Sequence, residues 1–493
     1  MRAHGRLGAT LAALLVAGAC AAPSRETRPP PPAAEAVAPA DRDRVPPLGP
    51  PPALKLPEQR KFQLANGLRV RLVEYHRLPI VALHLVLLDA GAVNDRPDRG
   101  GEASFTAAMV TEGTRTRSAT QISDELGGIG ASLGAGASMD AAYVSGHTLS
   151  RHLPTLVALL ADVTSNPAFP PSDFSRVQDQ RKVALLQQRD QPGAVASKAF
   201  GPLYWGSHPY GHWPMGTEAS VAATTAADLA RFHADHWRPG AAELVVVGDV
   251  DLATLRPLLE KAFAGWTGNA PARALAAERE AGSARAVLVE KRKASQTFLI
   301  LGMPGMARSD PDFVPAQVLF QVLGGGMASR LFRDLREEKG YTYGLTARES
   351  AQRLGGASYL GGSVRADATG QAVKDLLAEV EALRTTPVPG PELADAQNSM
   401  ALALPAEFAT ASGIAGKIAD QVVFGLPDDW WSVYAERVRT VTAEDVQRVA
   451  RRYLDPSRLV TVLVGDPAVV KPQLAGLPIG PVEVREGQAA RGR

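Results

Sequence analysis

The chain contains an internal repeat, and this repeat limits the folds that it can adopt. Residues 225–250 (TAADLARFHADHWRPGAAELVVVGDV) align without a gap with residues 442–467 (TAEDVQRVARRYLDPSRLVTVLVGDP). Each copy predicts a helix that begins at a capping threonine, a break at a proline, a β-branched strand and a Gly-Asp turn. The shared positions include Thr225, Ala226, Asp228, Arg231, Pro239, Gly248 and Asp249, matched by Thr442, Ala443, Asp445, Arg448, Pro456, Gly465 and Asp466. A duplicated α+β domain explains this agreement better than chance similarity between two helix–strand units.

Strand-like and helix-like segments alternate along the rest of the chain. Residues 62–74 (FQLANGLRVRLVE) predict a β-hairpin with Asn66-Gly67 at its turn, and VALHLVLLDAG predicts a buried strand. Long helices are expected at 150–163 and 171–189. At the offset of the repeat, SFTAAMV falls onto LGGGMASRLF, which predicts glycine-led helices at equivalent places in the two halves.

Length and composition divide the chain into two domains with flanking segments. A chain of 493 residues is too long for one core, and its 45% apolar and 21% charged residues are ordinary for a folded protein. The Ala/Gly-rich, charged stretch GNAPARALAAEREAGSARA has no clear strand pattern and is the expected linker. The predicted organisation is a signal peptide at 1–20, a tether at 21–57, a first domain at 58–267, the linker at 268–286, a second domain at 287–480 and a tail at 481–493.

The N-terminal segment has the character of an export signal. Basic residues precede the apolar run LGATLAALLVAGAC, which is too short to span a bilayer. Its ending resembles a bacterial lipobox, in which Cys20, the only cysteine, becomes the lipidated first residue; plain secretion is the alternative. The Pro- and Ala-rich residues 21–57 predict an extended tether. We therefore expect a lipoprotein of the bacterial cell envelope, on the periplasmic face of the outer membrane because Ala21 offers no inner-membrane retention signal.

Common signatures of catalysis and of nucleic-acid binding are missing from the sequence. It has no G-x-S-x-G elbow, no P-loop and no dinucleotide fingerprint. His208 and His212, and His233 and His236, have ligand-like spacing, but neither pair has a third ligand nearby, so turn or surface positions explain them better. The net charge of +2 and the aromatic content of 6% argue against a nucleic-acid partner.

Two phrases, GGEASFTAAMVTEGT and GGGMASRLFRDLREEKGYTYGL, together with the duplication, resemble the insulinase/pitrilysin family of zinc metallopeptidases. The nearest branch is that of the processing peptidases and their bacterial relatives, and the likeness runs from about residue 60 to about residue 475. The resemblance implies two homologous halves that face each other across a chamber. Each half would be an α/β roll, with a mostly antiparallel sheet covered by helices.

The zinc site of active family members is degenerate in this chain. Their first helix carries His-x-x-Glu-His, in which two histidines bind zinc and the glutamate activates water, and a glutamate some 75 residues later completes the ligand set. These positions correspond here to Ser104, Ala107, Ala108 and Ala184. Alanine neither coordinates a metal nor transfers a proton. We therefore expect no cofactor in this chain, with zinc held by a partner subunit instead.

The second half keeps a different pair of family residues. Active members carry an arginine followed seven residues later by a tyrosine, and both reach the substrate at the zinc site. In LREEKGYTY these residues are Arg336 and Tyr343, which the resemblance assigns to substrate and oxyanion binding. Spacing alone would favour a solvated helix end closed by Gly340.

Two small-residue segments are further candidates for substrate binding. GGIGASLGAGASMDAAYVSGHTL resembles the edge strand to which substrate adds in the family, and its Gly134, Ala135, Gly136 and Ala137 would leave the backbone open. Plain packing is an equal alternative for these residues. Gly324, Gly325 and Gly326 lack the lysine and Ser/Thr of a phosphate loop, so they indicate close backbone approach or a flexible loop.

The combined interpretation is a zinc-less subunit of a two-chain peptidase, inactive alone. It would bind peptide and supply Arg336 and Tyr343 to a homologous zinc-binding partner in a heterodimer. One alternative is a non-catalytic peptide-binding or envelope scaffold protein. Another is a zinc endopeptidase that uses unorthodox ligands, such as the histidines between 208 and 236.

Overall fold

The computed structural model describes residue 54, residues 56–269 and residues 282–487. The predicted signal peptide, Cys20, nearly all of the tether and the centre of the linker lie outside the described residues. All described elements belong to one compact unit, residues 51–493. Within the described ranges, no helix has the length and apolar character needed to cross a bilayer.

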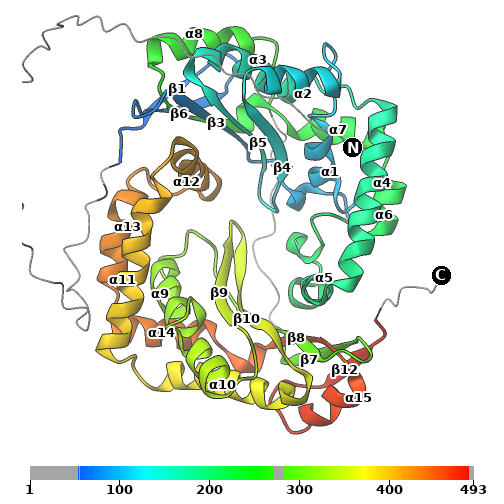
Figure 1. The fold of residues 1–493 in the computed structure, drawn as a ribbon, viewed down its shortest axis with the longest axis vertical. Helices are drawn as coiled ribbons and strands as arrows, with labels where there is room; N and C mark the ends of the chain where they lie inside the picture. Colours follow the sequence, from blue (N-terminus) through cyan, green and yellow to red (C-terminus); the bar gives the residue numbers. More distant parts are fainter. Residues whose placement is uncertain (1–53, 55, 270–281, 488–493) are drawn as a thin grey trace, which may run out of the picture. The chain divides into compact units, whose positions relative to one another are not determined.

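Two six-stranded sheets, which share the order of five of their strands, form the framework (Figure 1). The first has the order β1-β2-β6-β3-β5-β4, and the second has the order β12-β7-β11-β8-β10-β9. The strands of the first sheet are β1 (Arg60–Gln63), β2 (Arg69–Glu74), β3 (Ile80–Leu87), β4 (Ser132–Ala137), β5 (Ala142–Leu149) and β6 (Ala242–Gly248). Those of the second are β7 (Arg285–Glu290), β8 (Gln296–Pro304), β9 (Leu345–Gln352), β10 (Gly355–Arg365), β11 (Val460–Gly465) and β12 (Val482–Arg485). Most neighbours are antiparallel, which confirms the predicted fold class.

The helices also follow the same order in the two halves. Those of the first half are α1 (Glu102–Met109), α2 (Ala119–Gly128), α3 (Leu153–Ser165), α4 (Pro171–Gln187), α5 (Pro192–Trp205), α6 (Glu218–Ala223), α7 (Ala226–His236) and α8 (Leu252–Ala262). Those of the second are α9 (Phe313–Gly324), α10 (Thr369–Thr385), α11 (Gly390–Glu407), α12 (Ala411–Phe424), α13 (Trp430–Arg439), α14 (Ala443–Tyr453) and α15 (Pro467–Val470). The sequence repeat forms α7–β6 and α14–β11, and each helix begins with a Thr–Asp capping box.

The prediction of two glycine-led helices at equivalent places is wrong. The counterpart of α1 in chain order is α9, and the glycines end this helix instead of leading it. A π-helix, η6 (Phe332–Glu338), follows the glycines and takes the place that α2 has in the first half. Three consecutive glycines stop α9 because each loses more conformational freedom in a helix than any other residue.

The second domain extends at both ends beyond its predicted boundaries. Strand β7 begins at Arg285, inside the predicted linker. Strand β12, within the predicted tail, pairs in parallel with β7 and occupies the position that β1 has in the first sheet. The sixth strand therefore comes from the N-terminal side in one half and from the C-terminal end in the other.

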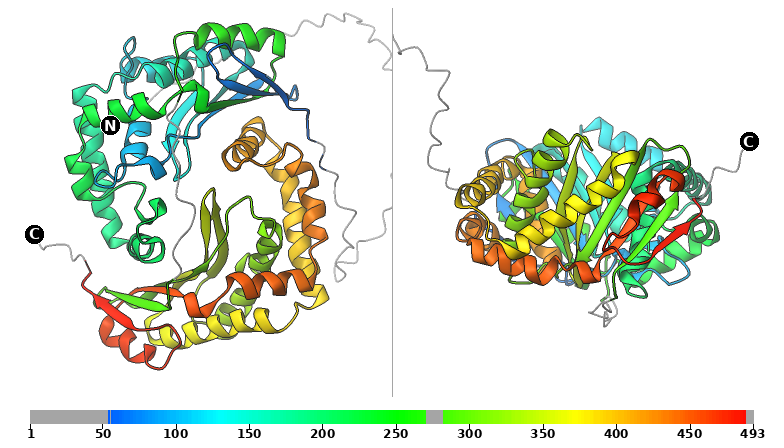
Figure 2. Two further views of the ribbon diagram at one scale, coloured as in Figure 1. Left: turned by 180° about the vertical axis from the view of Figure 1, so that it is seen from behind. Right: turned by 90° about the horizontal axis from the view of Figure 1, so that it is seen from below.

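Each half contributes one helix to the sheet of the other half (Figures 1 and 2). Helix α12 of the second half contacts β3 and β6, and helix α5 of the first half contacts β8 and β11. A Cβ atom at Gly302 of β8 would lie 2.1 Å from the Phe200 ring of α5, so glycine is required for this approach. The two halves thus share their hydrophobic cores.

Candidate functional site

Helix α1 is fixed at its start by a carboxylate that lies before it in sequence. Asp95 accepts hydrogen bonds from the backbone N–H groups of Gly101 (2.6 Å) and Ala103 (2.8 Å) and replaces an ordinary N-cap side chain. Gly101 has a φ of 100°, a conformation that favours glycine. His212 Nε2 lies 3.0 Å from Asp95; burial alone would lower the pKa of His212, but this carboxylate raises it above its ordinary value. The start of helix α1 is therefore held in place by Asp95.

The four degenerate zinc-site positions lie on α1 and α4 and offer one polar side chain. Ser104 donates its hydroxyl proton to the Pro214 carbonyl oxygen at 2.6 Å. Ala107 is fully buried in the core of the first sheet, whereas Ala108 and Ala184 are half-buried. The one hydroxyl is thus already committed to the protein backbone.

Arg181 of α4 fills the space beside Ser104. Its Nη2 donates to Ser104 Oγ at 2.7 Å and to the Met215 carbonyl oxygen at 3.2 Å. The guanidinium carbon lies 4.8 Å from the centroid of the Phe105 ring. Burial lowers the pKa of Arg181 to about 10, and the charge of Asp95 partly opposes this shift, so the side chain is cationic at neutral pH. Sequence reasoning missed Arg181, although it lies one helical turn before Ala184 on the predicted helix.

These residues do not fit a zinc ion. Zinc sites in proteins are built from imidazole, thiolate or carboxylate ligands, and the four positions provide none. A buried guanidinium adjacent to them adds electrostatic repulsion. Nowhere in the described ranges do three His, Cys, Asp or Glu residues come together in a way that could hold a metal ion.

The histidines with ligand-like spacing have other contacts. His208 is buried, accepts a hydrogen bond from Tyr210 N at 3.1 Å and packs against Trp205. His233 Nε2 lies 2.8 Å from the Thr164 carbonyl oxygen, and burial lowers its pKa to about 4. The structure therefore places His208 in a turn, as predicted, but in the interior and not at the surface.

Arg336 and Tyr343 lie on an exposed segment of the second half. Arg336 belongs to the π-helix η6, and its guanidinium carbon lies 4.4 Å from the Phe332 ring centroid. Tyr343 is 86% exposed. Neither side chain has a hydrogen bond or ion pair with another described residue, so both are available to an external group. Helices of the π type occur frequently at functional sites.

Contacts made by the residues between this pair hold the segment in place. Lys339 pairs with Asp334 and Asp375, both at 2.9 Å, and Thr342 donates to the Ser363 carbonyl oxygen at 2.6 Å. Gly340, with a φ of 64°, reverses the chain between them. Arg336 and Tyr343 are therefore free side chains on an anchored backbone.

The predicted substrate-binding segments have different environments. Strand β4, which holds Gly134, Ala135, Gly136 and Ala137, is the edge of the first sheet, and a Cβ atom at either glycine would meet open space. Gly324 is buried, and its Cβ would lie 2.3 Å from Ala347 N of β9, so packing explains this glycine. Gly325 and Gly326 are exposed. The open edge keeps β4 as a candidate for strand addition.

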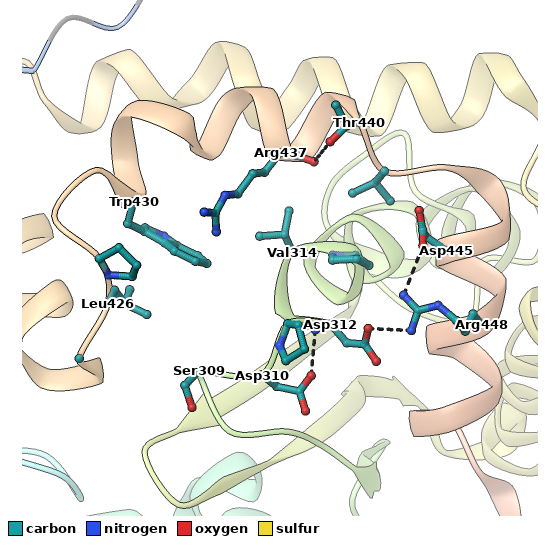
Figure 3. Close-up of a pocket in the computed structure, with 15 residues that line it drawn as sticks. Ser309, Asp310, Asp312, Val314, Leu426, Trp430, Arg437, Thr440, Asp445 and Arg448 are labelled. Carbon is teal, nitrogen blue, oxygen red and sulfur yellow. Dashed lines mark hydrogen bonds and ion pairs between the residues drawn. The ribbon is translucent and has the colours of Figure 1, made fainter.

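A cavity of about 610 Å³ lies in the second half, apart from these residues (Figure 3). Its acidic groups have internal partners: Asp312 pairs with Arg448 and Arg452, and Asp310 accepts from Tyr453. The Arg437 guanidinium lies 4.8 Å from the Trp430 ring centroid and faces the cavity. The charged groups of this cavity are thus engaged with one another or with an aromatic ring.

Two models of known protein families match the chain. Residues 72–201 match the family described as insulinase (peptidase family M16), and residues 223–400 match the peptidase M16 inactive domain. The chain belongs to peptidase family M16. Together these two matches include strands β3 to β6 of the first sheet, α1, α4 and the Arg336–Tyr343 segment of this M16 chain.

The similar curated proteins carry zinc-protease names. An uncharacterized zinc protease of Streptomyces coelicolor is 29% identical over 297 residues, which are 58% of this chain and 63% of that protein. The chain thus aligns with less than two thirds of that relative. An uncharacterized zinc protease of Mycobacterium bovis is 31% identical over 293 residues, 58% of this chain and 66% of that protein.

Solved structures confirm the M16 fold. The peptidase M16 inactive domain from Pseudomonas fluorescens aligns with a TM-score of 0.78 and 26% identity, covering 83% of this chain and 98% of that one. A protease from Helicobacter pylori gives a TM-score of 0.77 at 20% identity, covering 83% and 100%, and supports the fold alone.

Proposed function

We propose that this M16 chain is the zinc-less subunit of a two-chain metallopeptidase. It binds peptide and supplies Arg336 and Tyr343 to the zinc site of a homologous partner. The observation that carries the proposal is the contrast between the halves: the zinc-site positions hold no ligand, whereas the Arg/Tyr pair is exposed on an anchored segment.

Each residue of the pair has a chemical role that suits its environment. The Arg336 guanidinium can bind the peptide backbone or the oxyanion that forms during hydrolysis, because it has no internal carboxylate partner among the described residues. The Tyr343 phenol can donate a second hydrogen bond to the same oxygen. The partner's metal would polarise the peptide carbonyl and activate water, which this chain cannot do.

The cellular setting belongs to the same proposal. Lipidation of Cys20 and the Pro/Ala-rich tether would hold the folded unit near the periplasmic face of a bacterial outer membrane. The partner would be an exported M16 chain with an intact His-x-x-Glu-His helix, and the pair would form a heterodimer.

The first prediction concerns Arg336 in the presence of such a partner. The purified chain alone should show neither stoichiometric zinc nor peptide cleavage. A mixture with the partner should cleave peptides, and Arg336→Ala should lower kcat/KM about a hundredfold, as for loss of an oxyanion donor. Arg333→Ala is the matched control, because this nearby arginine is exposed and pairs with Glu392. Full activity of the Arg336→Ala mixture would exclude the catalytic contribution.

The second candidate function is peptide binding without catalysis in any complex. The open edge of β4 favours it, because strand addition needs only free backbone groups. Capture of extended peptides by the chain, with no partner peptidase recovered alongside it and no cleavage in any mixture, would support this alternative.

A further inference from the structure

We propose that Arg181 is a built-in replacement for a metal ion, whose guanidinium links α1 to α4 and excludes divalent cations from the degenerate site. This proposal rests on one part of the proposed function, the absence of zinc from this chain, and does not depend on the partner subunit. It would stand even if Arg336 had no catalytic role.

The Arg181 guanidinium lies where it can join the two helices of the degenerate site. In an M16 zinc site the ion would join α1, through positions 104 and 108, to α4, through position 184. Arg181 lies on α4 one turn before Ala184, and its Nη2 lies 2.7 Å from Ser104 Oγ on α1. The same group donates to the Met215 carbonyl oxygen at 3.2 Å and so connects the 213–216 loop to α1 and α4 as well. One side chain therefore makes the connections that several ligands and an ion would otherwise make.

The surroundings of the Arg181 guanidinium suit a planar cation. Ser104 accepts from Arg181 while donating to the Pro214 carbonyl oxygen, so its hydroxyl is satisfied in both directions. The Phe105 ring lies beneath the guanidinium at 4.8 Å and stacks in turn on Phe174 at 5.3 Å. A planar guanidinium suits such an aromatic face. A histidine at position 104 would compete with Arg181 for the same space.

The positive charge of Arg181 also opposes the binding of a metal ion. Within the described ranges, no carboxylate forms an ion pair with Arg181, so its charge is not neutralised by direct contact. The charge of Asp95 offsets it only in part. A divalent cation placed beside this largely buried positive charge is repelled, because the protein interior screens charges poorly. Restoring the zinc ligands alone would consequently not restore zinc binding.

The test is a graft of the missing ligands into the full chain, with and without Arg181. One variant carries Ser104→His, Ala107→Glu, Ala108→His and Ala184→Glu; a second adds Arg181→Ala. Zinc per chain is measured by atomic emission after dialysis, and affinity by competition with a chromophoric chelator. We expect stoichiometric zinc only in the variant lacking Arg181, with at least a hundredfold difference in Kd.

The matched control is the four-residue graft with Arg176→Ala. Arg176 lies on the same helix but is exposed and pairs with Glu112 and Asp173, so its removal should not create a zinc site. Stoichiometric zinc in the graft that retains Arg181 would overturn the proposal. So would an absence of zinc from both grafts when circular dichroism shows that they are folded.

A second measurement covers the case in which the grafts do not fold. In the otherwise unchanged chain, Arg181→Ala should lower Tm by several degrees, because Ser104 Oγ and the Met215 carbonyl lose a buried donor. Arg181→Lys should recover part of the loss, and Arg176→Ala should leave Tm within about a degree of the parent. An unchanged Tm for Arg181→Ala would contradict the proposed link.

Discussion

At the scale of single residues, Glu349 is a carboxyl group in an environment that favours its protonated form. It lies on β9, where Oε1 accepts from Met306 N at 3.2 Å and Oε2 lies 2.7 Å from Ser358 Oγ. Burial raises the pKa of Glu349 from 4.5 to about 7. Ser358 Oγ also lies 2.9 Å from the Pro304 carbonyl oxygen. Since a serine hydroxyl has one proton, a protonated Glu349 satisfies all three groups: it donates to Ser358, which donates to Pro304.

Glu349 should make the second half less stable as pH rises. Its folded-state pKa lies above the value of 4.5 in the unfolded chain, so the stabilisation is fully present below pH 4.5 and is lost as pH rises through 7. The difference corresponds to about 3 kcal/mol. Glu349→Gln keeps a donor and an acceptor without the charge, so its advantage over the parent should grow between pH 5 and pH 8. Urea unfolding at both pH values measures this advantage.

The control for this pH experiment is Glu337→Gln, at an exposed position of η6. This substitution should change the free energy of unfolding only slightly, and by the same amount at both pH values. If Glu349→Gln and the parent chain gave parallel stability–pH curves, the titration of Glu349 would not be the cause.

Some residue roles could be predicted from the sequence and others could not. The resemblance fixes the spacing of the zinc motif, and this spacing located Ser104, Ala107, Ala108 and Ala184. Arg181 could not be located in this way, because its importance depends on its contacts with Ser104 and the Met215 carbonyl. Those contacts join three segments that are distant in sequence.

At the scale of elements, the reliable predictions were those with strong local signals. The Asn66-Gly67 hairpin and the capped helices of the repeat are present because turn and cap chemistry act within a few residues. Strand β12 was missed, since its four residues (VEVR) alternate over too short a stretch to be a strong signal and its place is set by pairing with β7. The π-helix was missed as well, because an i→i+5 pattern has no sequence signature of its own.

The edge strand β4 allows a prediction that separates binding from folding. Along an edge strand, consecutive N–H groups point alternately toward the neighbouring strand and away from the sheet. Proline removes one N–H, so Gly134→Pro and Ala135→Pro remove donors on opposite sides. The variant that loses an N–H group pointing away from the sheet should lose affinity for extended peptides with little change in Tm. The variant that loses an N–H group pointing toward β5 should lower Tm, because a hydrogen bond to β5 is lost.

Peptide affinity by fluorescence anisotropy and Tm by calorimetry measure the two effects. Gly128→Pro, at the last residue of α2 and outside the strand, is a control for general damage by proline. Equal effects of both β4 substitutions on affinity and on Tm would contradict strand addition at this edge.

At the scale of the whole folded unit, the exchange of helices between halves decides how the chain must fold. Phe200, Tyr204 and Trp205 of α5 pack against Ile300 and Val462 of the second sheet. In the other direction, α12 places Ile414 and Ile418 in the core that includes Val245 and Val247 of the first sheet. Each half alone would therefore leave an apolar sheet face and an apolar helix uncovered. The sequence repeat showed the duplication but not this exchange, because the apolar positions of α5 and α12 do not specify which sheet they cover.

The two halves should consequently be inseparable as folded units. Residues 58–269 and 282–493 expressed separately should aggregate, whereas their co-expression should give one soluble complex by size-exclusion chromatography. Ile418→Asp on α12 should abolish this complex, because it would place an unpaired charge against the first sheet. The matched control is Glu381→Ala on the exposed face of α10, which should leave the complex intact. Soluble, monomeric and cooperatively melting single halves would contradict the shared core.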